Sequence, residues 1–133
     1  RDKLVTGVQT CALPIFRAFG SVAAAIARAR ALHPELPQIV EVETLAQLRD
    51  ALDTGCTRIL IDDFDADTRR EAVRIAKGAP YHGRIPLEVS GGVDMTTLRG
   101  IAEDGVDCIS IGGLTKHLHA IDFSLKLGPP PGG

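Results

Sequence analysis

Apolar and polar positions along the chain repeat with two periods, one typical of strands and one typical of helices. The first helical pattern begins after Ser21, which can serve as its N-cap, and ends at Pro34. Short apolar runs then predict strands at 38–42, 58–61, 85–89 and 107–111, and amphipathic stretches predict helices at 45–52, 65–77, 95–104 and within 114–124. A strand followed each time by a helix is typical of parallel strands with right-handed crossovers.

The predicted fold class is therefore α/β, with four βα units preceded by one helix. Four units make about half of an eight-unit barrel. We expect the chain to form the C-terminal portion of a parallel (β/α) barrel.

The two ends of the chain depart from this pattern. Residues 5–15, VTGVQTCALPI, have neither period and resemble the in-frame translation of a sequencing adapter. We therefore expect residues 1–15 to be an adapter artefact, residues 16–127 to form the partial barrel of a catalytic domain, and residues 128–133, GPPPGG, to be a disordered tail. On this interpretation the gene extends upstream of Phe16.

Composition narrows the class of protein and its partners. The 133 residues are 44% hydrophobic and 24% charged, which suits one globular domain, and 15 Lys plus Arg against 17 Asp plus Glu give a net charge of −2. Without a basic field we expect no nucleic acid and no membrane as partner, and any anionic ligand must be held locally. Three widely spaced cysteines without a CxxC pair indicate the cytoplasm. The four histidines show no zinc-ligand spacing.

Glycines follow two of the predicted strands at the end where parallel sheets bind ligands. Ser90, Gly91 and Gly92 lie between a strand and a helix that Asp94 can cap, where backbone N–H groups can surround a phosphate. A tight turn alone would also explain these glycines. Gly112 and Gly113 offer the same geometry one strand later, and two adjacent exits of this kind favour a phosphate site; additional contacts could come from Thr115 and Lys116, although Lys116 also fits a solvated helix position.

Acidic residues mark the ends of the other two strands. Glu41 and Asp62 would project into a barrel mouth, where carboxylates are costly unless they meet a metal, a cation or a polar substrate. Asp62 could bind Mg²⁺ or accept hydrogen bonds from a sugar; its alternative role as a helix cap is filled more naturally by Asp65. Glu88 shares the face of Ser90 at strand period and is an additional candidate.

Four segments in order carry a family resemblance: EVETLAQLRDALDTG, ILIDDF, PLEVSGG and GVDCISIGGLTKHLHAIDFSLKL. Together they resemble the C-terminal part of the quinolinate phosphoribosyltransferases, the carboxylating nicotinate-nucleotide pyrophosphorylases. The resemblance covers residues 16–127. It implies an incomplete α/β barrel within an enzyme that acts as a homodimer or higher homo-oligomer.

The resemblance also implies a reaction of NAD biosynthesis. Quinolinate and phosphoribosyl pyrophosphate, with Mg²⁺, would give nicotinate mononucleotide, pyrophosphate and CO₂. Glu41 and Asp62 match the family's acidic residues that face the ribose and the Mg²⁺-bound phosphates. The phosphate-holding loops of the family match Ser90, Gly91, Gly112 and Gly113.

The sequence departs from the family in three places. Asp63 stands where the family usually has Asn, and Gly113 stands where it often has Ala. A Lys-x-Asn-His strand end, which helps to bind quinolinate, would fall in the segment that resembles an adapter. We therefore expect this polypeptide to be inactive by itself.

Two other functions remain open from the residues alone. Another phosphate-binding α/β-barrel synthase, of thiazole or indole biosynthesis, would share the paired glycine exits but needs a catalytic lysine on a strand, and no predicted strand carries one. A non-catalytic receiver-like domain would explain Asp62 and Asp63, but Ser90 stands where such a domain needs its phosphorylated aspartate.

Overall fold

The computed structural model of the chain, which describes residues 20–116 and 125, contains a four-stranded parallel sheet. The strands follow each other in the order of the sequence: β1 (Ile39–Val42), β2 (Arg58–Asp62), β3 (Leu87–Ser90) and β4 (Cys108–Ile109). Between and around them lie α2 (Val22–Leu32), α3 (Leu45–Thr54), α4 (Ala66–Lys77), α5 (Leu98–Glu103) and α6 (Gly113–Lys116). The predicted fold class, parallel α/β with four βα units after one helix, is confirmed.

Side-chain caps begin α2, α3 and α4, and the sequence predicts those at Ser21 and Asp65. The Ser21 hydroxyl accepts a hydrogen bond from the Ala24 amide at 3.1 Å. The hydroxyl of Thr44 accepts from the Gln47 amide, and the carboxylate of Asp65 accepts from the Thr68 amide at 2.7 Å. Each cap satisfies an N–H group that the helix itself leaves unpaired, which is why α2, α3 and α4 begin at these positions.

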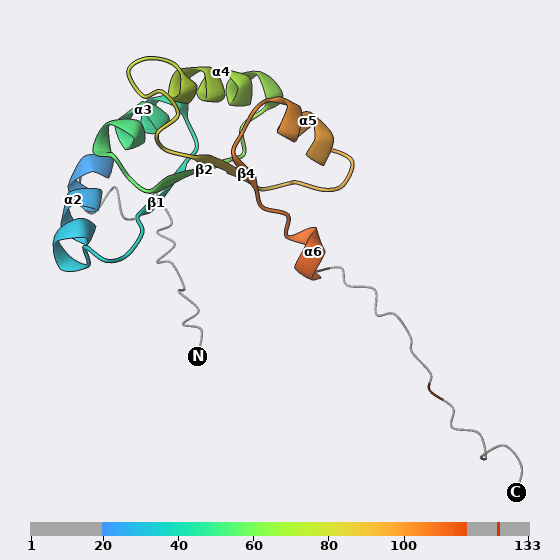
Figure 1. Cartoon of the computed structure of the whole chain (residues 1–133), viewed down its shortest axis with the longest axis horizontal. Coiled ribbons are helices and arrows are strands. Elements are labelled where there is room, and N and C mark those ends of the chain that lie inside the picture. Colours follow the sequence, from blue (N-terminus) through green and yellow to red (C-terminus); the bar gives the residue numbers. More distant parts are fainter. Residues whose placement is uncertain (1–19, 117–124, 126–133) are drawn as a thin grey trace, which may run out of the picture.

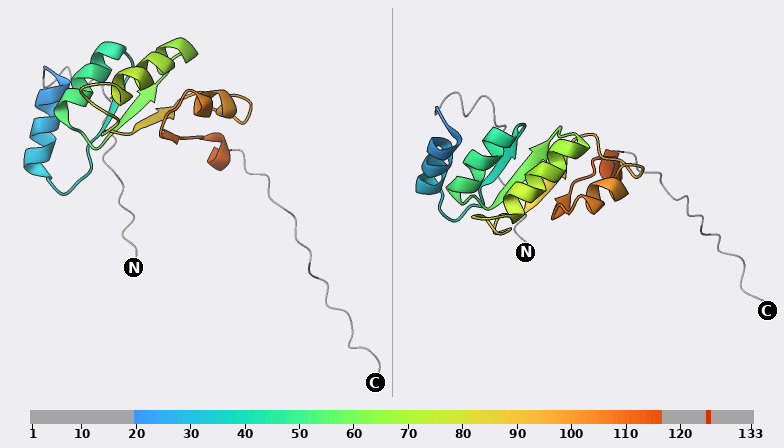
Figure 2. Two further views of the ribbon diagram at one scale, coloured as in Figure 1. Left: turned by 45° about the horizontal axis from the view of Figure 1, so that its top comes forward. Right: turned by 90° about the horizontal axis from the view of Figure 1, so that it is seen from above.

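The hydrophobic core lies between the sheet and its helices, on one face of the sheet (Figures 1 and 2). Alternate strand residues point into it: Val40, Val42, Ile59, Ile61, Leu87 and Val89 are buried. They meet the buried faces of the helices, to which α3 contributes Leu48 and α4 contributes Ile75. Because strand side chains alternate, the intervening residues lie on the opposite face, and these are mostly polar.

Several element boundaries differ from the sequence prediction. Strand β3 begins at Leu87 rather than 85, since Pro86 has no N–H group to donate to a ladder, and β4 has two residues instead of five. Helix α5 begins at Leu98 rather than 95. The last predicted helix is represented by α6, and the rest of it lies outside the described residues, as do the predicted adapter segment and the predicted tail.

Among the described residues, no helix combines the length and the apolar character that crossing a bilayer requires.

Candidate functional site

Four of the candidate residues lie on the polar face of the sheet, towards its carboxyl edge: Glu41, Asp62, Glu88 and Ser90. In the register of the strands, Glu41 is opposite Leu60, and Leu60 is opposite Glu88. Two positions further along β2 and β3, Asp62 is opposite Ser90. The structure therefore brings these predicted residues onto one face, and the expectation that Glu88 shares the face of Ser90 is confirmed.

Glu41 and Asp62 form a pair of neighbouring carboxylates. Partial burial raises the pKa of Glu41, and repulsion from the charges of Asp62 and Glu43 and hydrogen bonding with Asp62 raise it further. A negatively charged pair of this kind attracts a cation or a developing positive charge. The two carboxylates are therefore suited to face a metal ion or an electron-poor sugar.

Asp62 also approaches the loop that follows β3. The Ser90 hydroxyl lies 3.5 Å from Oδ1 of Asp62, a long hydrogen bond. A Cβ atom on Gly91 would lie only 2.7 Å from the same oxygen, and Gly91 has a φ of 79°. Both the close approach and the left-handed conformation explain why glycine occupies this position.

The turn after these glycines is held by Asp94. Hydrogen bonds from the Thr96 hydroxyl and from the amides of Thr97 and Thr96 lower the pKa of Asp94 to about 2. Asp94 therefore caps the turn over residues 95–97, and the backbone carbonyl of Asp94 accepts a hydrogen bond from the Leu98 amide at 3.0 Å. The prediction that Asp94 caps the helix itself is wrong: α5 begins one turn later, at Leu98, with Thr97 at its N-cap position and no side-chain cap, so Asp94 holds only the turn that precedes it.

Asp63, which departs from the family's usual Asn, adopts a left-handed backbone conformation with a φ of 59°. Asn and Asp tolerate this conformation better than other residues that carry a Cβ atom. The departure therefore keeps the backbone requirement of this position and adds one negative charge beside Asp62.

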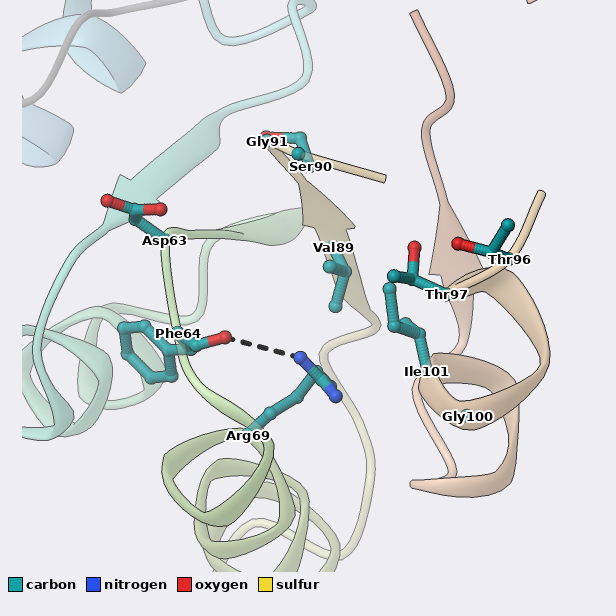
Figure 3. A pocket seen from close by; sticks show the side chains of 11 residues that line it. Asp63, Phe64, Arg69, Val89, Ser90, Gly91, Thr96, Thr97, Gly100 and Ile101 are labelled. Carbon is teal, nitrogen blue, oxygen red and sulfur yellow. Dashed lines mark hydrogen bonds between the residues drawn. The ribbon is translucent and has the colours of Figure 1, made fainter. Parts of the chain in front are cut away.

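A cleft of about 440 Å³ opens between the loops after β2 and β3 (Figure 3). Of the predicted site residues, Ser90, Gly91 and Gly92 line it, whereas Glu41 and Asp62 do not. Its complete lining is Asp63, Phe64, Arg69, Val89, Ser90, Gly91, Gly92, Thr96, Thr97, Gly100 and Ile101. The loop of Ser90 to Gly92 therefore takes part in the lining of this cleft, while the two acidic residues lie outside it.

Arg69 also lines this cleft, and the sequence pattern gives no sign of that. Its Nε atom lies 2.7 Å from Oδ2 of Asp104, and Nη1 donates to the carbonyl oxygen of Phe64 at 3.2 Å (Figure 3). The side chains of Arg69 and Asp104 are only 11% and 7% exposed. The partner is 35 residues away in the chain, so no local pattern could have revealed this ion pair.

The second glycine pair follows β4. Gly112 lies just before α6 and Gly113 is its first residue. The side chains of Thr115 and Lys116 lie outside the described residues. The contribution of these four residues to a phosphate site therefore stays a prediction.

The residues present fit one kind of magnesium site. Within residues 20–116, no group of three or more His, Cys, Asp or Glu side chains is gathered in the way that an all-protein metal site requires. Mg²⁺ commonly binds one or two carboxylates and completes its shell with water and substrate phosphates. Glu41 and Asp62 supply two neighbouring carboxylates, which fits such a shared site.

The geometry defines a class of protein: a parallel α/β sheet with carboxylates on two adjacent strands and glycine loops at the next two exits, as in phosphate-binding α/β barrels. Comparison with known proteins gives the family. The family model described as "Quinolinate phosphoribosyl transferase, C-terminal domain" matches residues 14–126. The chain belongs to this family, and the resemblance stated from the sequence is confirmed.

Named relatives agree with this assignment. The chain is 38% identical over 111 residues to the nicotinate-nucleotide pyrophosphorylase [carboxylating] of Mycobacterium leprae, covering 83% of this chain and 38% of that protein. It is 36% identical over 107 residues to the chloroplastic protein of that name from Oryza sativa, covering 69% of this chain and 28% of the relative. The chain thus spans well under half of the length of these relatives.

Solved structures give the same result for the fold. The nicotinate-nucleotide pyrophosphorylase of Francisella tularensis matches with a TM-score of 0.74 and 36% identity, over 80% of this chain and 36% of that chain. NadC from Streptococcus pyogenes matches with a TM-score of 0.76 and 35% identity, over 85% of this chain and 38% of that chain. Membership of this family argues against the two alternatives, a different phosphate-binding barrel synthase and a receiver-like domain.

Proposed function

We propose that this chain is the part of a quinolinate phosphoribosyltransferase that holds the phosphoribosyl group. The complete enzyme would transfer this group from phosphoribosyl pyrophosphate to quinolinate, with release of pyrophosphate and CO₂ and formation of nicotinate mononucleotide. The observation that carries the proposal is the placement of Asp62 beside Ser90 and Gly91, which brings a carboxylate next to a glycine loop suited to phosphate. Membership of the family supports the choice of reaction.

The carboxylates would act on the sugar. Displacement at the anomeric carbon develops positive charge on the ribose, and fixed negative charges nearby stabilise that charge in the transition state. Glu41 and Asp62 supply these charges from adjacent strands. When bound, Mg²⁺ would be held by the same two side chains and would neutralise charge on the pyrophosphate that leaves.

The glycine loops would hold the phosphate. Backbone N–H groups around Ser90, Gly91 and Gly92 can donate to phosphate oxygens, because these glycines place no side chain over the loop. We assign the same role to Gly112 and Gly113 at the next exit, with Thr115 and Lys116 as additional contacts. Glu88 would support the site through its hydrogen bonds with Arg58 and Ser110 rather than by touching substrate.

The partners and the compartment are part of the same proposal. The complete enzyme would act as a homodimer or higher homo-oligomer on these two substrates, without nucleic acid or membrane. We assign it to the cytoplasm, although plant relatives carry chloroplastic or mitochondrial in their names.

A grafted enzyme tests the function. Residues 16–126 of this chain would replace the matching segment of the Bacillus subtilis relative, which is 35% identical over 111 residues. We expect nicotinate mononucleotide to form from quinolinate and phosphoribosyl pyrophosphate, and Asp62→Asn to lower kcat at least about 100-fold because electrostatic stabilisation is lost.

The matched control is Asp67→Asn, at a carboxylate on α4 that is 92% exposed and pairs with Arg70. This variant should keep the activity of the graft. A folded graft that binds both substrates without making product would overturn the proposal, and so would an Asp62→Asn graft of undiminished kcat.

A further inference from the structure

A chain of three polar side chains crosses the polar face of the sheet from β2 to the end of β4. Nη1 of Arg58 donates to Oε2 of Glu88 at 2.7 Å. The hydroxyl of Ser110, the residue directly after β4, donates to Oε1 of the same carboxylate. Each oxygen of the Glu88 carboxylate thus accepts one of these hydrogen bonds, and the Glu88 side chain is only 14% exposed.

The positions of these residues connect the two glycine exits. Glu88 precedes Ser90 by two residues, and Ser110 precedes Gly112 by two residues. Since strand side chains alternate, Glu88 and Ser90 share a face. One carboxylate thus joins the strand that leads into the first glycine loop to the residue that leads into the second. Arg58 is the first residue of β2, the strand that ends at Asp62, so the same carboxylate is also connected to β2.

The short length of β4 makes this connection important. Its two residues pair only as Glu88 with Cys108 and Val89 with Ile109. Beyond them the Ser110 amide donates to the Val89 carbonyl at 2.9 Å, and further contact with β3 on this face comes from the Ser110 hydroxyl. A ladder this short leaves much of the placement of the second exit to side-chain bonds.

The charge on Glu88 suits a structural anchor. Burial alone would raise its pKa, but hydrogen bonds from Ser110 and Arg58 and the charge of Arg58 outweigh burial and lower it. The carboxylate is therefore ionised at neutral pH and accepts two bonds. A general acid would need the opposite shift, towards neutral pH.

We propose that Arg58, Glu88 and Ser110 form a positioning network that sets the distance between the glycine loop at Ser90–Gly92 and the one at Gly112–Gly113. None of the three touches substrate. The network acts through the two loops, because their N–H groups can donate to the same phosphate only when the loops are correctly spaced. This inference rests on the proposed function, because it takes both loops as parts of one phosphate site.

The test is a titration of the ¹⁵N-labelled 133-residue chain with inorganic phosphate, followed through the amide signals of Gly91, Gly92 and Gly112. Ser110→Ala removes one hydrogen bond to Glu88 and changes no charge. We expect it to raise the phosphate dissociation constant about threefold to tenfold, the range of the net contribution of one ordinary hydrogen bond, with little change in the melting temperature. Ser110→Thr keeps a hydroxyl and should restore binding.

A second variant separates position from charge. Glu88→Gln removes a negative charge, which by simple repulsion should favour phosphate, and it also weakens both bonds of the network. We expect weaker phosphate binding, since the loops lose their spacing. The matched control is Glu71→Gln, which removes the carboxylate that pairs with Arg74 on α4, away from the glycine loops.

The outcomes distinguish the two proposals. If phosphate leaves the glycine signals of the unaltered chain unchanged, the phosphate site of the proposed function is wrong, and the network loses its role with it. If the unaltered chain binds phosphate and Ser110→Ala binds equally well, the positioning network is wrong and the phosphate site stands. Tighter binding by Glu88→Gln would also contradict the network.

Discussion

Oδ1 of Asp62 lies 2.7 Å from the place that a Cβ atom would take on Gly91. No side chain carbon fits at that distance from an oxygen, so any other residue at position 91 must push either the carboxylate or the loop away. The acidic residue and the glycine loop therefore depend on each other for their positions.

This dependence predicts different effects at two neighbouring glycines. Gly91→Ala should lower the free energy of unfolding by about 2–3 kcal/mol, because it combines left-handed strain with the clash against Asp62. Gly92→Ala is the matched control: its φ of 57° imposes strain, but nothing lies within 4 Å of the added carbon, so about 1 kcal/mol is expected. Urea unfolding of both variants measures the difference. Equal losses would mean that Asp62 moves without cost.

The ion pair between Arg69 and Asp104 should be important for stability. Their Nη2 and Oδ2 atoms are 2.6 Å apart, and both side chains are nearly buried. Arg69→Met would leave Asp104 with only its weaker contact to Arg70 at 3.3 Å, and we expect a loss of about 2–4 kcal/mol in urea unfolding.

The matched control for that variant is Arg74→Met. The side chain of Arg74 is 71% exposed and pairs with Glu71 on the same helix. Its removal should change the free energy of unfolding by no more than about 0.5 kcal/mol. Similar losses in the two variants would refute the importance of the buried pair.

Glu41 and Glu88 should affect the pH dependence of stability in opposite ways. The pKa of Glu41 is raised above its ordinary value of 4.5, so the folded chain holds this proton more tightly than the unfolded chain. Its contribution is present below pH 4.5 and is lost as pH rises through the folded pKa. Glu41→Gln should therefore gain stability relative to the unaltered chain between pH 4 and 7.

Glu88 has a lowered pKa, so its contribution is present above its ordinary value of 4.5 and is lost as pH falls through the folded pKa. Glu88→Gln should be less stable than the unaltered chain at pH 7, and the deficit should shrink on acidification. Thermal melts between pH 3 and 7 give both curves. Parallel curves for the two variants would show that the environments of these carboxylates are alike.

Position 63 should accept Asn and reject a branched residue. Asp63→Asn restores the family's usual residue and keeps the left-handed backbone, so the melting temperature should hardly change. Asp63→Val should lower the free energy of unfolding by about 1–2 kcal/mol, because a β-branched side chain is strained at a φ of 59°. Equal melting temperatures for the two variants would show that this loop relaxes.

The sequence predicts those parts of the structure that depend on local pattern. The caps at Ser21, Thr44 and Asp65 satisfy nearby amides, and each is visible within four residues of sequence. The end of β4 was less predictable, because a strand ends where its neighbour stops pairing, and that depends on β3. The ion pair of Arg69 and the contacts of Glu88 bridge distant segments, so neither could be read from one helix or one strand.

The common edge of the candidate residues was predictable, because parallel strands all end at the same edge of a sheet. That Asp62 lies beside Ser90 depends on the pairing and register of β2 and β3, which this rule does not give. The rule gives no information on side-chain partners. The sequence therefore indicates Glu88 as a candidate site residue, but it does not indicate that Arg58 and Ser110 donate hydrogen bonds to the two oxygens of Glu88.

The one-sided packing of the sheet has a consequence for how this family can change. The residues that fold the chain point towards the helices, and the residues proposed to act on substrate point the other way, although both sets alternate along the same strands. A substitution at Glu41 or Ser90 replaces no core side chain. Substitutions on the polar face can therefore change which ligand is bound, while the residues on the core face keep the fold. Each strand is thus subject to two separate sets of constraints.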